Sequence, residues 1–125
     1  MEENRIGKLI LGCALKVHTA LGPGLLESAY EACLARECQK SGLSYKRQLV
    51  LPIIYDGEQI DAGYRLDLLV ADLVVVEMKA VQQLVDVHQA QLLSYLKLGG
   101  YRLGYLLNFN VPRMKEGIWR LVNGL

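Results

Sequence analysis

The stretch from Arg65 to Ala80, RLDLLVADLVVVEMKA, most restricts what this chain can fold into. It consists mainly of Leu and Val, which is typical of buried strands, so we expect a sheet that is covered on both faces. Three charged residues interrupt its apolar character: Asp67, Glu77 and Lys79. Ionised groups are costly to bury unless they are paired, hydrogen-bonded or bound to a metal. The pattern therefore indicates either a metal site with a catalytic lysine beside it or an internal salt-bridge cluster.

The rest of the chain alternates between helical and strand patterns. Apolar residues at three- and four-residue steps predict helices, and runs rich in Val, Ile, Leu and Tyr predict strands. The predicted helices are Ile6–Leu21, Pro23–Lys40 and Gln82–Leu98, and the predicted strands are Tyr45–Tyr55, Glu58–Val70, Leu73–Ala80, Tyr101–Phe109 and Gly117–Val122. Asp56-Gly57 is a strong two-residue hairpin signal, and Pro52 indicates an edge strand or a bulge. The resulting order, α-α-β-β-β-α-β-β, predicts a mixed α/β fold with Leu73–Ala80 as a central strand.

Length and composition limit the class of protein. A chain of 125 residues without a linker or repeat predicts one domain, residues 1–125. With 14 basic and 13 acidic residues, it lacks the positive bias of a dedicated nucleic-acid binder, so any such contact needs a local patch. Three cysteines without a C-x-x-C pair favour reduced thiols. An acidic N-terminus and the absence of a membrane-length apolar run lead us to expect a cytoplasmic protein that does not enter the membrane.

The spacing of the charges sets a geometric condition. Residues two apart in a strand share a face, so Glu77 and Lys79 project together. Asp67 joins them only if the connection near Val70–Leu73 has three or five residues, or contains a bulge. A two-residue turn at Ala71-Asp72 would send Asp67 to the other face. The metal-site hypothesis depends on this register.

The third predicted helix carries a polar stripe. His88, Gln91 and Tyr95 lie at three- and four-residue steps. If the stripe faces the end of the central strand, Gln91 and Tyr95 can reach a metal-bound water, a carboxylate or a phosphate. Glu27, one turn into the second helix, can close the site from that helix.

These residues match the motifs of a known family. An Asp followed by E-x-K at a hairpin, with an acidic helix before it, resembles the PD-(D/E)XK nuclease superfamily. GLLESAY, at Gly24–Tyr30, resembles the signature of the GxxExxY family within it. The Q-x-x-x-Y at Gln91–Tyr95 looks like the motif of the RecB-type exonuclease branch. Together the four elements cover Gly24–Tyr95, in the right order and on the right secondary structures.

The resemblance implies a restriction-endonuclease-like α-β-β-β-α-β core, here with an extra N-terminal helix and a short C-terminal strand. It also implies metal-dependent cleavage of phosphodiester bonds in nucleic acid, with DNA favoured over RNA and RNA left open. Asp67 and Glu77 would bind Mg²⁺ or Mn²⁺, helped by the backbone carbonyl of Met78 and by Glu27, and hard oxygen ligands suit these ions. Lys79 would orient or deprotonate the attacking water and stabilise charge in the transition state. The carried-over catalytic residues are Lys79, Glu77, Asp67, Glu27, Gln91 and Tyr95.

Each candidate also has a purely structural explanation. Glu27 can favour the positive end of a helix dipole, and Tyr30 can be ordinary core. Gln91 and Tyr95 can be helix surface and core rim. His18, just before the Gly22-Pro23 turn, fits a buried or capping histidine as well as a metal ligand. The proposed nucleic-acid contacts, which solvated surface charges would equally explain, are Lys46, Arg47, Arg65 and His88.

Two classes of function remain open from the sequence. The first is the metal-dependent nuclease. The second is a catalytically silent nuclease fold that serves as a nucleic-acid-binding or protein-assembly module. The near-neutral net charge is compatible with this alternative, because nonspecific nucleic-acid binding depends on Lys and Arg and is expected to be weak here. A domain this small, without a separate recognition domain, is compatible with a homodimer.

Overall fold

The structure, a computed structural model that describes residues 1–125, is built on a five-stranded mixed sheet in the order β1-β4-β5-β6-β7. The strands are β1 (Tyr45–Val50), β4 (Arg65–Val70), β5 (Val74–Lys79), β6 (Leu103–Asn108) and β7 (Ile118–Val122). β5 and β6 are parallel, and the other neighbours are antiparallel. The aliphatic strand β5 lies at the centre, as its composition predicts.

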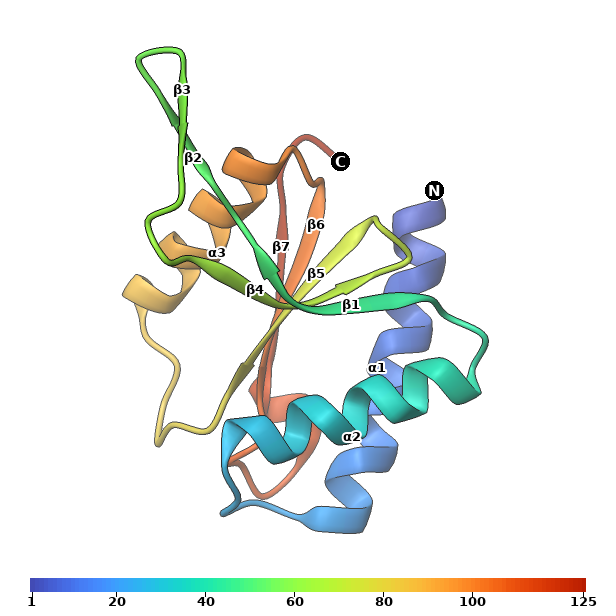
Figure 1. Cartoon of the computed structure of the whole chain (residues 1–125). Helices are drawn as coiled ribbons and strands as arrows, with labels where there is room; N and C mark the ends of the chain where they lie inside the picture. The colour runs from blue at the N-terminus through green and yellow to red at the C-terminus, as the bar shows by residue number, and fades with distance from the viewer.

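Helices cover both faces of the sheet (Figure 1). α1 (Glu2–Leu21) and α2 (Glu27–Lys40) share a core of 20 buried residues with one face, and α3 (Asp86–Gly99) shares a smaller core of 9 buried residues with the other. A 3₁₀ turn, η1 (Met114–Gly117), precedes β7. None of the helices combines the length and the hydropathy needed to span a bilayer.

The α/β class and the element order predicted from the sequence are confirmed. The expected α-β-β-β-α-β core corresponds to α2, β1, β4, β5, α3 and β6, and α1 and β7 are the extra helix and the short C-terminal strand. Because β5 and β6 are parallel, the chain must cross the sheet between them, and α3 is that crossover.

The two long strands expected on either side of Asp56-Gly57 are each interrupted, which corrects the prediction. Their outer parts form a separate two-stranded ribbon, β2 (Ile53–Tyr55) and β3 (Glu58–Ile60), that projects from the body (Figure 1). Pro52 explains one break, because it has no N–H to donate to a ladder. The hairpin turn itself is confirmed, since Asp56 and Gly57 both have positive φ, as a type I′ turn requires.

Two helices begin later than predicted. α2 starts at Glu27 instead of Pro23, because Gly22 and Gly24 adopt positive φ angles that a right-handed helix excludes. α3 starts at Asp86 instead of Gln82. At that end, Val85 N donates to His88 Nδ1 (3.0 Å) and His88 N donates to Val85 O (2.9 Å), so this reciprocal pair defines the first turn.

Candidate active site

Strands β4 and β5 separate in the middle of the sheet. They pair with each other only from Leu68–Val76 to Val70–Val74. Beyond that point β4 continues alongside β1, and β5 continues alongside β6 (Figure 1). By this register Asp67 lies opposite Glu77, where the two strands part. The sheet therefore opens at the two carboxylates.

The connection between β4 and β5 meets the condition set by the charge spacing. The ladder joins Val70 to Val74, which leaves the three residues Ala71–Leu73 as the connection. The first two of them have φ angles of +55° and +56°, so the turn is tight and left-handed. This register places Asp67 and Glu77 on the same face of the sheet.

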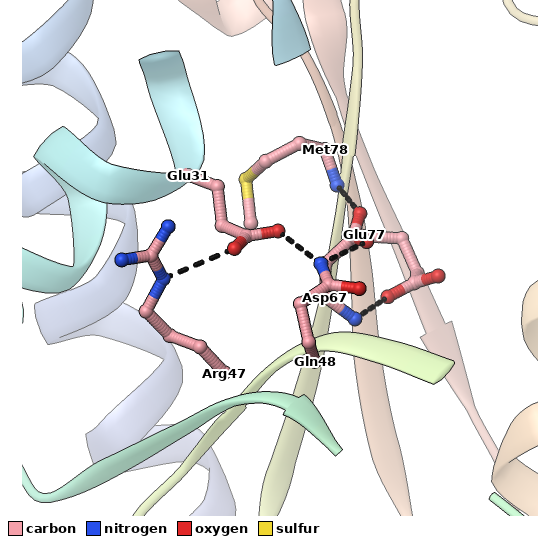
Figure 2. A network of polar contacts seen from close by, with 6 residues as sticks. All are labelled: Glu31, Arg47, Gln48, Asp67, Glu77 and Met78. Atoms are coloured by element: carbon pink, nitrogen blue, oxygen red, sulfur yellow. Dashed lines mark hydrogen bonds and ion pairs between the residues drawn. The ribbon is translucent and has the colours of Figure 1, made fainter. Parts of the chain in front are cut away.

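Side chains replace the missing ladder bonds at the opening (Figure 2). Asp67 N donates to Glu77 Oε2 (2.7 Å), and Met78 N donates to Asp67 Oδ2 (2.9 Å). Each carboxylate thus accepts a backbone N–H from the opposite strand, which satisfies amide groups that would otherwise be orphaned in the sheet. The result is two carboxylates held face to face by rigid strands.

Glu77 is the more deeply buried of the two, with 6% of its surface exposed. Burial, and next the negative charge of Asp67, raise its pKa from 4.5 to about 8. The hydrogen bond from the Asp67 backbone and the charge of Lys79 act in the opposite direction but are outweighed. Near neutral pH, Glu77 therefore holds a proton that a cation beside it would displace.

Lys79 projects from the same face of β5 as Glu77 and Val75, because alternate residues of a strand share a face. That face packs against α3, since Val75 belongs to the core shared with Leu92 and Leu96. The backbone of Lys79 is fixed from the next strand, where Phe109 N donates to Lys79 O (3.1 Å). The residue as a whole is half-buried.

A third carboxylate, Glu31 of α2, lies beside the opening and was not assigned from the sequence. Only 5% of its surface is exposed. It accepts hydrogen bonds from Arg47 Nε (3.0 Å) and Gln48 Nε2 (2.7 Å), and Gln48 Nε2 also donates to Asp67 Oδ1 (3.3 Å) (Figure 2). The available signal was its position one turn after Glu27 on the same helix face.

Glu27 and Tyr30, the two motif residues of α2, have different surroundings. Glu27 is the first residue of the helix, is exposed, and makes no hydrogen bond or ion pair. Tyr30 is fully buried: its hydroxyl donates to Gly22 O (2.6 Å) and accepts from Leu25 N (3.1 Å), and its ring stacks on Phe109 at 4.4 Å. Through Phe109, Tyr30 places the start of α2 beside the end of β5.

The polar stripe of α3 is only partly directed toward the site. Tyr95 is buried, its ring lies 5.7 Å from that of Tyr64, and burial raises the pKa of its hydroxyl, with a smaller contribution from the negative charge of Glu77. Gln91 is exposed beside it. His88 stabilises the first turn of α3, because its Nδ1 accepts a hydrogen bond from Val85 N.

The four residues proposed to contact nucleic acid each have a partner within the chain. Lys46 is paired with Asp72 at the β4–β5 turn (3.0 Å), the end of the sheet opposite Lys79. Arg47 is paired with Glu31, and Arg65 with Asp61 (3.3 Å). The structure does not gather the three cations into one patch.

Two further polar residues, His18 and Asn108, hold backbone segments near the candidate site by hydrogen bonds. His18 is buried, and its Nε2 lies 2.8 Å from Val111 O, so this nitrogen carries the proton and donates. Asn108, directly opposite Lys79 in the parallel register, bonds both backbone groups of Val81 (3.1 and 3.0 Å). Asn108 thereby fixes the segment that follows Lys79, a role that no local sequence pattern indicated.

The donor set at the opening fits a hard divalent cation. No group of three or more His, Cys, Asp or Glu side chains is arranged as a metal cage. Mg²⁺, however, is commonly bound by one or two carboxylates and keeps several waters. The two facing carboxylates and the adjacent Met78 carbonyl offer only oxygen ligands. Burial, and next the charge of Asp67, raise the pKa of Glu77, and the nearby Lys79 does not offset them.

Comparison with known proteins agrees with this geometry. A family model described as the PD-(D/E)XK nuclease superfamily matches residues 4–121. The match begins in α1 and ends in β7, so it includes the whole sheet and the opening between β4 and β5. No protein of curated function and no solved structure matches the chain significantly. Since the family model accounts for nearly the whole chain, the protein belongs to the PD-(D/E)XK nuclease superfamily.

Proposed function

We propose that this protein is a divalent-metal-dependent nuclease that hydrolyses phosphodiester bonds in DNA. The observation that carries the proposal is the pair of facing carboxylates, Asp67 and Glu77, at the point where β4 and β5 separate, with Lys79 on the same strand face. Membership of a nuclease superfamily implies a nucleic-acid substrate. The metal dependence and the choice of DNA are our inference.

Asp67, Glu77 and the carbonyl of Met78 would hold Mg²⁺ or Mn²⁺. When bound there, the cation supplies Lewis-acid polarisation of the scissile phosphate and lowers the pKa of the attacking water. Glu27 is the candidate for a further ligand, because it is unpaired and lies on the end of α2 that Tyr30 and Phe109 hold beside β5. Glu31 is less suited to that role, since Arg47 and Gln48 engage both of its oxygens.

Lys79 and Tyr95 would act on the substrate side. The Lys79 ammonium donates up to three hydrogen bonds and carries a full positive charge, so it can orient a water and stabilise negative charge on the phosphoryl oxygens. Tyr95, with its raised pKa, remains protonated at neutral pH and can donate its hydroxyl hydrogen to a phosphate or a water. Gln91, beside it on the same helix face, would add a second neutral donor.

The finer assignment rests on motifs. We place the chain in the GxxExxY group because of GLLESAY at Gly24–Tyr30, and the Q-x-x-x-Y of α3 favours DNA because it resembles the RecB-type exonuclease motif. Lys46, Arg47, Arg65 and His88 remain our candidates for phosphate contacts. They would have to exchange an internal partner for a phosphate to do so.

A cleavage assay tests the proposal. Purified protein is incubated with single-stranded, duplex and branched DNA and with RNA, in Mg²⁺, Mn²⁺ or EDTA. We expect cleavage of DNA that EDTA abolishes, and a loss of about 10²-fold or more in Glu77→Gln and Lys79→Ala, because each removes a group acting on the transition state.

Matched substitutions outside the site serve as controls. Glu58→Gln, on the exposed β2–β3 ribbon, and Lys8→Ala, on the exposed side of α1, should retain full activity. Cleavage that survives in EDTA, or in both site variants, would contradict the proposal. If the wild-type protein binds nucleic acid but cleaves no substrate under any condition, the catalytically silent binding module is the better description.

A further inference from the structure

Gln48 has a backbone conformation that its position does not explain. It lies within β1, between Arg47, which pairs with Leu68, and Leu49, which pairs with Leu66. Its φ angle is +51°, whereas strand residues have negative φ. Glutamine has no special tolerance for the left-handed region, so an outlier of this kind calls for a local cause and is often associated with a functional site.

The cause is visible in the contacts of two consecutive side chains (Figure 2). Neighbouring residues of a regular strand point to opposite faces, yet Arg47 and Gln48 bind the two oxygens of the same carboxylate, Glu31. Only the left-handed turn of the backbone at Gln48 makes this possible. The same turn brings the Gln48 amide to Asp67, which lies opposite Gln48 in the register.

The amide then links the two carboxylates. Its nitrogen carries two hydrogens and donates to Glu31 Oε1 (2.7 Å) and to Asp67 Oδ1 (3.3 Å). Because Asp67 Oδ2 already accepts from Met78 N, both oxygens of Asp67 are now held, and the plane of its carboxylate is defined. Glu31 in turn is fixed by Arg47. The chain of contacts therefore ends in the ion pair between Arg47 of β1 and Glu31 of α2.

The chemistry of the amide suits a metal ligand. A lysine or arginine at this position would orient Asp67 equally well but would neutralise the negative charge that a cation needs. A neutral amide orients the carboxylate and leaves its charge intact. Partners that hold a ligating carboxylate in this way commonly change metal affinity about 10- to 100-fold when removed.

We propose that Gln48 is a positioning residue that holds Asp67, through the Glu31–Arg47 pair, in the orientation that binds the divalent cation. This inference rests on the proposed metal-dependent function. It adds a metal-orienting unit from β1 and α2 to the residues of β4 and β5, and it accounts for the left-handed backbone at Gln48.

The test compares Gln48→Gly with the wild-type protein, both freed of metal. Glycine adopts positive φ without strain, so the variant loses the amide and keeps the backbone path. We expect the Kd for Mn²⁺, measured by titration calorimetry, to rise about 10- to 100-fold. The Tm of the metal-free variant should stay close to that of the wild type, because relief of the left-handed backbone strain offsets the lost hydrogen bond to the buried Glu31 carboxylate. Gln48→Ala, which loses the same amide but keeps the strain, should bind Mn²⁺ as weakly and have a lower Tm than Gln48→Gly.

Asp56→Gly is the matched control. Asp56 also has a left-handed φ, +53°, but it lies at the tip of the exposed β2–β3 ribbon, outside the site. Its substitution reports the effect of glycine at such a backbone and should leave Mn²⁺ binding unchanged.

The possible outcomes separate this inference from the function it rests on. Unchanged Mn²⁺ affinity in Gln48→Gly, with normal binding by the wild type, would overturn the positioning role and leave the nuclease proposal standing. Weaker binding accompanied by a clearly lower Tm in Gln48→Gly would also overturn it, because Gln48 would then serve the fold. Absence of Mn²⁺ binding by the wild-type protein would refute both.

Discussion

Glu77 is the most perturbed acid of the candidate site. Its carboxyl group lies between β4 and β5, accepts the Asp67 N–H, and faces the Asp67 carboxylate. Burial makes its ionised form costly, and the second carboxylate adds to that cost. In the absence of a cation, Glu77 is therefore a neutral acid over much of the physiological pH range.

This protonation predicts that the metal-free protein loses stability as pH rises. The pKa of Glu77 is about 8 in the folded protein and about 4.5, its ordinary value, in the unfolded chain. Between these values the folded state binds the extra proton, so the stabilisation is full below pH 4.5 and is lost as pH rises through 8. We expect the Tm in EDTA to fall by roughly 5–10 °C between pH 6 and pH 9 because of this group.

Glu77→Gln isolates that contribution. The amide cannot ionise, so the variant should show a smaller decrease in Tm and should be the more stable protein at pH 9. Addition of Mg²⁺ at pH 9 should restore the Tm of the wild type and not that of the variant. Parallel Tm profiles for the two proteins in EDTA would show that the acid is not buried as described.

At the scale of elements, the loop before α2 is organised by one tyrosine. Gly22–Leu26 has no regular structure, yet the Tyr30 hydroxyl bonds the carbonyl of its first residue and the N–H of Leu25. The ring of Tyr30 meanwhile stacks on Phe109, which follows β6. The tyrosine of the GLLESAY motif thus has a structural task that sets the start of α2, and with it the position of Glu27.

Tyr30→Phe should lower the free energy of unfolding by about 1–2 kcal/mol. The substitution keeps the stacked ring and removes only the hydroxyl, which leaves two backbone groups of the loop without their partner. Urea unfolding followed by circular dichroism measures the change.

Tyr55→Phe provides the comparison. That hydroxyl belongs to a side chain that is 71% exposed on the β2–β3 ribbon, so its removal should change the free energy by less than about 0.5 kcal/mol. Equal stability of Tyr30→Phe and the wild type would mean that the loop does not depend on the hydroxyl.

The charge of the whole molecule bears on how it would bind DNA. Fourteen basic residues are balanced by 13 acidic ones, and the arginines nearest the site are paired with Glu31 and Asp61. Affinity for a polyanion depends on how many phosphates the protein neutralises. We therefore expect a small electrostatic contribution of about three phosphate contacts, made by Lys79 and by those of Lys46, Arg47 and Arg65 that exchange an internal partner for a phosphate.

A salt titration of DNA binding tests how many phosphates the protein contacts. About three phosphate contacts predict that log K for duplex DNA falls with log salt concentration with a slope of roughly −3. Fluorescence anisotropy in EDTA between 50 and 200 mM NaCl measures the slope. Substitution of Lys79 by Ala should make it shallower by about one, whereas Lys8→Ala should not alter it. A slope of about −6 or steeper would reveal a basic surface that these residues do not account for.

Much of the fold was predictable because its signals are local. The aliphatic composition of β5, the Asp56-Gly57 turn and the three-to-four-residue periodicity of α1 all act within a few residues of the chain, and each predicted the element that the structure contains. The errors lie at the ends of elements, where a glycine, a proline or a side-chain contact a few residues away decided the outcome. The loop at Gly22–Leu26 is held by Tyr30, and the ribbon β2–β3 departs from β1 and β4 at Pro52.

Some residues of the candidate site were predictable from the sequence and others were not. The spacing of Asp67, Glu77 and Lys79 was sufficient to state the register that would bring them together, and the register found is of that kind. Glu31, Gln48 and Asn108 were missed because their partners are 16 to 27 residues away in the sequence. The left-handed φ of Gln48 also carries no sequence signal, since glycine or asparagine would be expected there.

The sequence by itself therefore determined the elements, their order, and which charges lie among apolar neighbours, because periodicity and burial cost act residue by residue. Only the tertiary structure decided that β4 and β5 separate at Asp67 and Glu77, and that Arg47 and Gln48 hold one carboxylate between them. The physical reason is that strand separation depends on which neighbour each strand pairs with. Those pairings join segments far apart in the chain, and no local pattern records them.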